Sequence, residues 1–275
     1  MLVCLYRLHN SSCKDHHRCF FNPDKYHIIL MDQRGAGRSR PLGRLKHNTT
    51  NHILLDMEAI RKKLSIEKWL LFGGSWGATL ALIYAQQYTS NVLGLILRGT
   101  FLARSKDADW FFKEGANRLY PEAWYRFTEF ISKNERKEVL KAYYHRLNID
   151  DADVQQDTTR EWDAWGGAVV LGEEFNAEEL EGEVPETAIA QARIETHYAM
   201  NDYFIRENQI LENAIRIQDL PCTIIHGQKD YMCPIESSFT LAKALPNAKF
   251  IPLPNSTHLA HGEEMIDALV SATDA

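Results

Sequence analysis

Apolar positions along the chain follow two different periods. Short, almost wholly apolar runs are typical of buried strands, and such runs are found at residues 26–31, 69–72, 92–97, 222–226 and 249–253. Other segments repeat apolar residues every three or four positions, which predicts helices at 53–64, 76–88, 235–245 and 263–272. Strands that alternate with helices predict a mostly parallel, doubly wound sheet with helices on both faces.

Residues 101–215 interrupt this alternation. Tryptophan, tyrosine, phenylalanine, glutamate and arginine recur there at helical spacing, and convincing strand alternation is missing. The strand pattern returns at 222–226. The chain therefore predicts an α/β core in two parts, 1–100 and 216–275, with an all-helical cap at 101–215 inserted between them.

The composition is that of a globular protein. Of the 275 residues, 45% are apolar and 25% are charged, and the formal net charge is −6. Basic residues are scattered among acidic ones, as in Arg61 to Lys63 beside Glu58 and Glu67, which indicates a solvated helix face. We therefore expect neither a nucleic-acid surface nor, since no apolar run reaches about 18 residues, a membrane span.

The cysteines bear on compartment and on metal binding. There are five, an odd and sparse number without C-x-x-C spacing, which favours reduced thiols and a cytoplasmic protein. His16 and His17 lie beside Cys13 and Cys19, but no second ligand pair follows at zinc spacing. We expect no metal and no organic cofactor.

A nucleophile is predicted at Ser75. Residues 73–77 read G-G-S-W-G, which matches G-x-S-x-G, and a predicted strand runs into this motif while a helix follows it at once. This context is typical of a nucleophile elbow, in which glycines relieve crowding at a sharp turn and the serine hydroxyl projects above the sheet. The alternative interpretation is a glycine-rich turn without chemistry.

A serine hydroxyl needs a base and an orienting acid. In this fold the partners follow in the order serine, acid, histidine. Asp230 comes just after a late strand and is the predicted acid, whereas Asp219 lies before that strand. His258 and His261 both follow the last strand, and His258, nearer the strand end, is the predicted base. His226 lies at the end of its strand, where a structural histidine is expected.

Several segments resemble proline iminopeptidases of the α/β-hydrolase superfamily. The resemblance runs from about residue 16 to the C-terminus. It is carried by residues 32–39 (D-Q-R-G-A-G-R-S), 73–78 (G-G-S-W-G-A), 98–101 (R-G-T-F), 114–116, 120–124, 192–198 (A-R-I-E-T-H-Y), 226–230 (H-G-Q-K-D) and 233–234. The elbow together with the R-I-E-x-H-Y segment is much more specific than G-x-S-x-G alone.

The resemblance implies a serine peptidase that removes proline from peptide N-termini. Carried over to this sequence, it makes Ser75 the nucleophile, Asp230 the acid and His258 the base. The backbone amide of Trp76 supplies one oxyanion donor. The implied partner is a peptide substrate with a free N-terminus.

The resemblance also implies three substrate-binding residues. Glu195 matches a glutamate that holds the substrate's free amino group, a role that suits a carboxylate in a poorly hydrated pocket. Phe101 and Phe111 match aromatic positions that line the pocket for the proline ring. Without the resemblance, Glu195 would be an ordinary glutamate on a helix face, and the two phenylalanines would be ordinary cap packing.

One departure concerns specificity. The family often carries a second amine-binding glutamate after a W-x-x-W pair, and this chain has Gly166 there. Glu173 and Glu174 are the candidates to replace it. The substitution leads us to expect release of other small residues besides proline, and an esterase or amidase acting on small acyl substrates is the alternative function.

The other departure concerns the N-terminus. The family has an H-G-G-P-G oxyanion loop, but this chain has no glycine before Gly35, and Leu8 to Ser12 occupy the corresponding region. An oxyanion hole needs a second backbone donor from such a loop. We therefore expect that the N-terminal strands of the fold are missing. An inactive, truncated homologue without a complete oxyanion hole is a further alternative.

Overall fold

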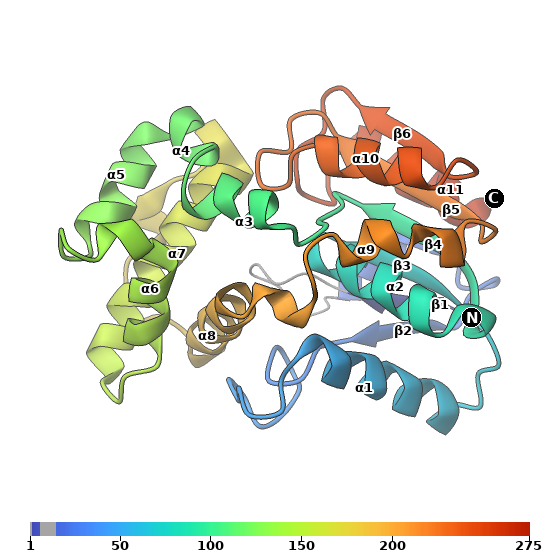
Figure 1. The fold of residues 1–275 in the computed structure, drawn as a ribbon, viewed down its shortest axis with the longest axis horizontal. Coiled ribbons are helices and arrows are strands. Elements are labelled where there is room, and N and C mark those ends of the chain that lie inside the picture. Colours follow the sequence, from blue (N-terminus) through green and yellow to red (C-terminus); the bar gives the residue numbers. More distant parts are fainter. Residues whose placement is uncertain (1, 6–14) are drawn as a thin grey trace.

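The computed structural model describes residues 2–5 and 15–275 (Figure 1). A six-stranded sheet has the order β2-β1-β3-β4-β5-β6, and every neighbouring pair is parallel. The strands are β1 (Leu2–Leu5), β2 (Ile28–Met31), β3 (Trp69–Gly74), β4 (Val92–Arg98), β5 (Cys222–Gly227) and β6 (Lys249–Leu253). The five strands predicted from the apolar runs are confirmed. Strand β1, which lies between β2 and β3, was not predicted.

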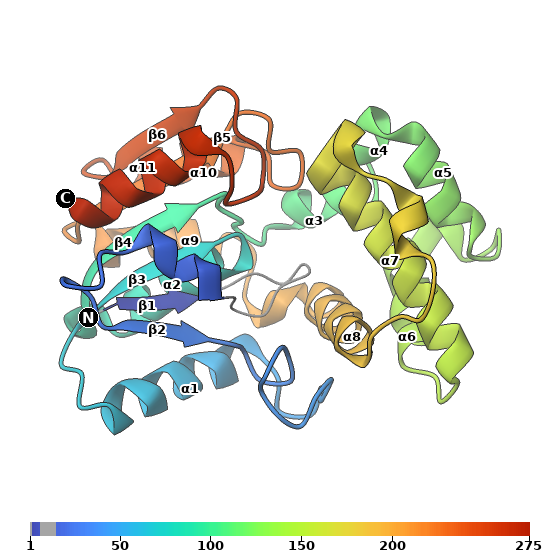
Figure 2. The ribbon, with the colours of Figure 1, turned by 180° about the vertical axis from the view of Figure 1, so that it is seen from behind.

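Helices cover both faces of the sheet. They are α1 (Thr50–Lys63), α2 (Trp76–Gln87), α10 (Glu236–Ala244), α11 (Glu263–Asp274) and the 3-10 turns η1 (Asp15–Phe20) and η2 (Thr89–Asn91). Figures 1 and 2 show α1, α2 and α10 on one face and η1 with α11 on the other. The predicted doubly wound, mostly parallel sheet is therefore correct.

Side chains of the central strands alternate between two hydrophobic cores. In β4, Leu95 and Leu97 pack with α1 and α2, whereas Ile96 packs on the opposite face with η1 and α11. In β5, Ile224 and Ile225 divide in the same way. Because successive strand residues point to opposite faces, strands buried on both sides must be apolar throughout.

The chain between β4 and β5 is helical. Its helices are α3 (Ser105–Phe112), α4 (Ala116–Leu119), α5 (Pro121–Glu129), α6 (Val139–Leu147), α7 (Ala152–Leu171), α8 (Glu186–Met200) and α9 (Gln209–Glu212). Between them lie the 3-10 turns η3 (Arg136–Glu138), η4 (Gly172–Glu174), η5 (Ala177–Leu180), η6 (Asp202–Phe204) and η7 (Ala214–Ile217). In Figure 2 the arrowheads of β2 and β4 point toward these helices.

Helices α3 to α7 have a hydrophobic core of their own. It is rich in aromatic side chains, including Phe127, Tyr143, Trp162 and Trp165. Helix α8 packs against a different core: its Ile194 and Tyr198 join the hydrophobic core that the sheet shares with α1 and α2. The helices between β4 and β5, called the helical lobe below, therefore contact the core of the sheet through α8. The boundaries at 101 and 215 stay a prediction of the sequence. None of the described helices is both long and apolar enough to cross a membrane.

Candidate active site

Ser75 occupies the sharp turn between β3 and α2. Its backbone has φ 57° and ψ −122°, a conformation that is strained for a residue with a side chain. A Cβ on Gly73 would collide with the backbone of Gly77, and one on Gly74 would collide with the guanidinium of Arg98. The glycines are therefore required by close packing around the turn, and the predicted elbow is present.

His258 links Ser75 to Asp230. Its Nε2 lies 3.2 Å from Oγ of Ser75, and its Nδ1 lies 2.6 Å from Oδ2 of Asp230. The exposed fractions are 6% for Ser75, 3% for Asp230 and 0% for His258. A carboxylate that accepts from Nδ1 fixes the tautomer, so that Nε2 is free to accept the serine proton.

The carboxylate of Asp230 is held by its own loop. Oδ1 accepts hydrogen bonds from the backbone N–H groups of Met232, at 3.1 Å, and Cys233, at 2.8 Å. These donors set the orientation of the carboxylate. The acid predicted from its place after a late strand thus meets His258 in the folded chain.

Residues at the ends of β4 and β5 hold the loop that carries His258. Arg98, at the end of β4, is buried and donates a hydrogen bond from Nη1 to the backbone carbonyl of His258. Gly227 lies so close to Ser256 that a Cβ there would collide with the backbone carbonyl. His261 is exposed in the same loop, and it is His258 that reaches Ser75.

His226 is a fully buried histidine directly below the acid. Its Nδ1 lies 2.6 Å from Oγ of Ser238, and its Nε2 lies 2.7 Å from the carbonyl of Cys233 and 3.2 Å from Oδ2 of Asp230. It therefore ties α10 to the loop of Asp230. The sequence predicted a structural histidine here but not its contact with the acid.

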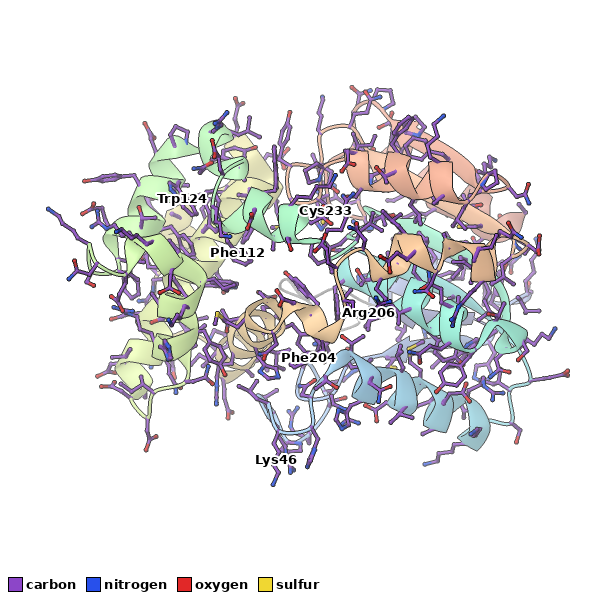
Figure 3. The ribbon with its side chains drawn as sticks, in the orientation of Figure 1. Lys46, Phe112, Trp124, Phe204, Arg206 and Cys233 are labelled. Atoms are coloured by element: carbon purple, nitrogen blue, oxygen red, sulfur yellow. The ribbon has the colours of Figure 1, made fainter. Side chains whose placement is uncertain are left out.

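A pocket rich in aromatic side chains opens beside Ser75. Its lining includes Phe101, Phe111, Phe112, Trp162, Glu195, Tyr203 and Cys233. Figure 3 labels Phe112 at the end of α3 and Cys233 in the loop between β5 and α10. The predicted positions Phe101, Phe111 and Glu195 thus share one pocket with the candidate nucleophile, and their roles stay a prediction.

Glu195 is the buried carboxylate of this pocket. Only 5% of the residue is exposed. Its Oε2 accepts a 2.7 Å hydrogen bond from the indole of Trp162, and its Oε1 accepts a 2.9 Å hydrogen bond from the amide of Gln191. Both donors are neutral side chains, and they orient the carboxylate toward the pocket lining.

A second carboxylate in the pocket was missed by the sequence analysis. Asp107 lines the pocket and forms a bidentate pair with Arg104, with Nη2–Oδ1 at 2.6 Å and Nε–Oδ2 at 2.9 Å. The guanidinium neutralises it. The three-residue spacing of Arg104 and Asp107 at the start of α3 could have predicted this ion pair from the sequence. Glu173 and Glu174, the proposed substitutes near Gly166, are exposed in η4.

The backbone amide predicted as an oxyanion donor lies at the start of α2. Trp76 is the first residue of α2, so its backbone N–H has no acceptor within the helix and is available as a donor. Leu8 to Ser12 and Cys13 lie outside the described residues. Among the side chains that the structure describes, no group of three or more histidines, cysteines, aspartates or glutamates is placed to hold a metal ion.

Comparison with solved structures identifies the fold. The structure resembles an alpha/beta fold family hydrolase from Bacillus anthracis, with a TM-score of 0.61, 22% identity, and coverage of 99% of this chain and 90% of that one. It also resembles an esterase from Exiguobacterium antarcticum, with a TM-score of 0.59, 18% identity, and coverage of 100% and 91%. Residues 19–130 match the family model described as alpha/beta hydrolase fold. The chain has the α/β-hydrolase fold.

Sequence relatives define the family more closely. The chain is 42% identical over 278 residues to a proline iminopeptidase from Xylella fastidiosa, covering 100% of this chain and 88% of the relative. It is 40% identical to one from Arabidopsis thaliana, with coverage of 94% and 68%, and 39% identical to one from Neisseria meningitidis, with coverage of 94% and 82%. The chain belongs to the proline iminopeptidase family.

Proposed function

We propose that this protein is a serine aminopeptidase that releases proline, and other small residues, from the free N-terminus of peptides. The observation that carries the proposal is the buried carboxylate of Glu195 in the same pocket as Ser75. A hydrolase for neutral esters has no use for a buried negative charge beside its nucleophile, whereas an aminopeptidase must bind a cationic terminus. Family membership supports the same activity.

The first half of the reaction forms an acyl-enzyme. Nε2 of His258 takes the proton of Ser75 as Oγ attacks the carbonyl carbon of the first residue. Asp230 stabilises the resulting imidazolium, and the N–H of Trp76 donates to the developing oxyanion. The imidazolium then gives its proton to the leaving amine of the second residue, and the peptide bond breaks.

The second half returns the enzyme to its starting state. Water enters as the shortened peptide leaves, and His258 removes a proton from it while its oxygen attacks the acyl carbon. Ser75 leaves with the proton from His258, and the free amino acid is released. The same base thus serves both half-reactions, and these steps need no metal or organic cofactor.

Substrate recognition follows from the two kinds of pocket wall. The aromatic rings of Phe101 and Phe111 suit the compact apolar ring of proline. Glu195 pairs with the primary or secondary ammonium group of the terminus. Asp107 does not bind the amine in this proposal, because Arg104 already neutralises its charge. Because Gly166 stands where the family often has a second amine-binding glutamate, alanyl substrates are also accepted in this proposal.

The proposal is tested with four substrates and one inactive variant. Prolyl arylamide, alanyl arylamide, N-acetylprolyl arylamide and a short-chain aryl ester are compared by kcat/KM, with Ser75→Ala as the control. We expect the prolyl arylamide to be fastest, the alanyl arylamide slower, and the acetylated substrate inert. Equal cleavage of the acetylated substrate, or cleavage of the ester alone, would make the protein an esterase or amidase.

Active-site labelling separates an enzyme from an inactive homologue. We expect a fluorophosphonate probe to label Ser75 covalently and Ser75→Ala to remain unlabelled. Absence of labelling on the folded wild-type chain would contradict the proposed activity.

We also place the protein in the cytoplasm. Cys19, Cys222 and Cys233 are free thiols, which suits a reducing compartment. Cell fractionation with an antibody against the native chain tests this, and recovery of the protein from an extracytoplasmic fraction would contradict it.

A further inference from the structure

Residues 33–55 have a charge pattern unlike the rest of the chain. This segment contains four arginines and one lysine and no aspartate or glutamate, although the whole protein has a formal net charge of −6. The segment joins β2 to the first turns of α1. The folded chain therefore gathers positive charge on the loop that follows β2.

This loop encloses a hollow of about 560 Å³ against α1. Met31, Ala59 and Ile60 form its apolar part, and the side chains of Arg40, Arg44 and Lys46 stand along its rim. All three rim residues are exposed. We call this feature the cationic hollow. Figure 3 shows Lys46 at the outer tip of the loop, below α8.

The two carboxylates in the cationic hollow are already neutralised. Asp56 forms a bidentate pair with Arg34, with Nε–Oδ2 at 2.7 Å and Nη2–Oδ1 at 2.6 Å. Asp32, whose side chain is only 5% exposed, lies 3.3 Å from Nε of Arg38. Arg34 and Arg38 therefore neutralise the two carboxylates, which no longer favour a cation in the cationic hollow.

The rim cations have no such partners. Arg40 donates to the backbone carbonyls of Gly37, at 3.0 Å, and Ser39, at 3.2 Å. Among the described residues, Arg40, Arg44 and Lys46 form no ion pair with a carboxylate. The cationic hollow thus carries about three uncompensated positive charges around a concave surface, which is an arrangement that attracts anions.

We propose that the cationic hollow binds a small anion that carries two or more phosphoryl groups, such as pyrophosphate or a nucleoside triphosphate. Arginine guanidinium groups match phosphoryl oxygens in bidentate geometry, and lysine adds a compact charge. Three cations favour a multivalent anion over a monovalent one. Pockets for small molecules have volumes of about 300–1,000 Å³, and the cationic hollow falls in this range.

This site is separate from the candidate active site. The cationic hollow and the pocket beside Ser75 have no lining residue in common. Binding at the cationic hollow can therefore be measured whether or not the protein is a peptidase, and failure of either proposal leaves the other intact.

Calorimetric titration of the full chain tests the proposal. Pyrophosphate, ATP and monophosphate are titrated at matched ionic strength into the wild type, Arg44→Gln, and the triple variant Arg40→Gln/Arg44→Gln/Lys46→Gln. We expect saturable 1:1 binding of pyrophosphate and ATP and much weaker binding of monophosphate. Arg44→Gln should weaken binding about tenfold, as expected for one charged hydrogen-bond partner, and the triple variant should abolish it.

A control triple removes the same charge elsewhere. Lys68, Lys133 and Arg216 are exposed and form no ion pair with the described residues, so Lys68→Gln/Lys133→Gln/Arg216→Gln should keep wild-type affinity. Equal weakening in this control would show that overall charge, and not the cationic hollow, attracts the anion. Absence of saturable binding to the wild type would overturn the proposal.

Two further titrants distinguish binding of a small anion from binding of a charged macromolecule. Single-stranded DNA and polyglutamate carry repeated negative charges but are too large to enter a hollow of this size. We expect neither to compete with pyrophosphate at equal charge concentration. Saturable binding of one of them together with no binding of pyrophosphate would replace the proposed small-molecule site by a macromolecular surface.

Discussion

Trp162 on α7 donates a hydrogen bond of 2.7 Å from its indole nitrogen to Oε2 of Glu195 on α8. Both residues are buried, with exposed fractions of 2% and 5%. The bond joins the core of the helical lobe to the pocket beside Ser75. It means that packing within the lobe determines where the proposed amine-binding charge sits.

Replacing Glu195 should impair substrates with a charged terminus selectively. Glu195→Gln keeps the shape but loses the charge, and loss of such a buried pairing costs about 2–5 kcal/mol, which is at least about 30-fold in kcat/KM. The measurement compares prolyl arylamide with a small neutral ester, whose turnover should change much less. Equal losses on both substrates would mean that Glu195 supports the fold and does not bind the amine.

Replacing Trp162 should weaken the same recognition less. Trp162→Phe keeps an aromatic ring but removes one donor to Glu195, so kcat/KM for prolyl arylamide should fall about tenfold. Trp124 provides a matched control, because it packs in the same aromatic cluster and its indole nitrogen bonds to none of the described residues. Comparable losses in Trp124→Phe would attribute the effect to packing in the lobe.

The two histidines that follow β6 should differ sharply. His258→Ala removes the base that lies 3.2 Å from Ser75, so kcat should fall by at least about 10⁴-fold. His261→Ala changes an exposed side chain, and kcat should stay within about twofold. Circular dichroism confirms that both variants fold. If His261→Ala were the inactive variant, the assignment of the base would be wrong.

Gly74→Ala should displace His258 although the new methyl group does not contact it. The new Cβ collides with the guanidinium of Arg98, which holds the backbone carbonyl of His258. Displacing His258 by about 1 Å should lower kcat by about 10²-fold. The double variant Gly74→Ala/Arg98→Ala should recover thermal stability but not full activity, since the clash is removed and the anchor is lost. A fully active Gly74→Ala would contradict this account.

Glu58 should make stability depend on pH. It lies on α1 with its side chain 8% exposed, and hydrogen bonds from Arg61 chiefly, and also from Tyr84 and Asn91, lower its pKa from 4.5 to about 2. A carboxyl whose pKa is lower in the folded state stabilises the fold above about pH 4.5, and this contribution is lost as pH falls toward 2. Its size at neutral pH is about 3 kcal/mol.

Denaturant titrations of Glu58→Gln between pH 7 and pH 3 check this expectation. The variant should be less stable than the wild type at pH 7, and the difference should shrink toward pH 3, because the unfolded wild-type chain takes up a proton at Glu58 below about pH 4.5 while the folded chain does not. Glu138→Gln serves as the control, because Glu138 pairs with Lys141 on the exposed surface and its loss should matter little at any pH. A difference for Glu58→Gln that does not vary with pH would rule out its charge as the cause.

Much of the core was predictable because its signals are local. The motif around Ser75 combines a strand, glycines and a helix within a few residues, and no other part of the chain is needed to recognise it. The order of Asp230 and His258 after late strands follows from parallel topology, which brings the carboxyl ends of strands to one edge. Strand β1 escaped prediction because four apolar residues without flanking turn signals do not specify an element.

What the sequence by itself determined was therefore the class of fold, five of the six strands, the elbow and the candidates for the three groups of the reaction. Only the tertiary structure decided which partners these groups meet. Trp162 and Glu195 lie 33 residues apart, and helix periodicity shows that each has a buried face but not that the two faces meet. The neutralisation of Asp107 by Arg104, the contact of His226 with Asp230 and the cationic hollow depend in the same way on distances in space, which no local spacing encodes.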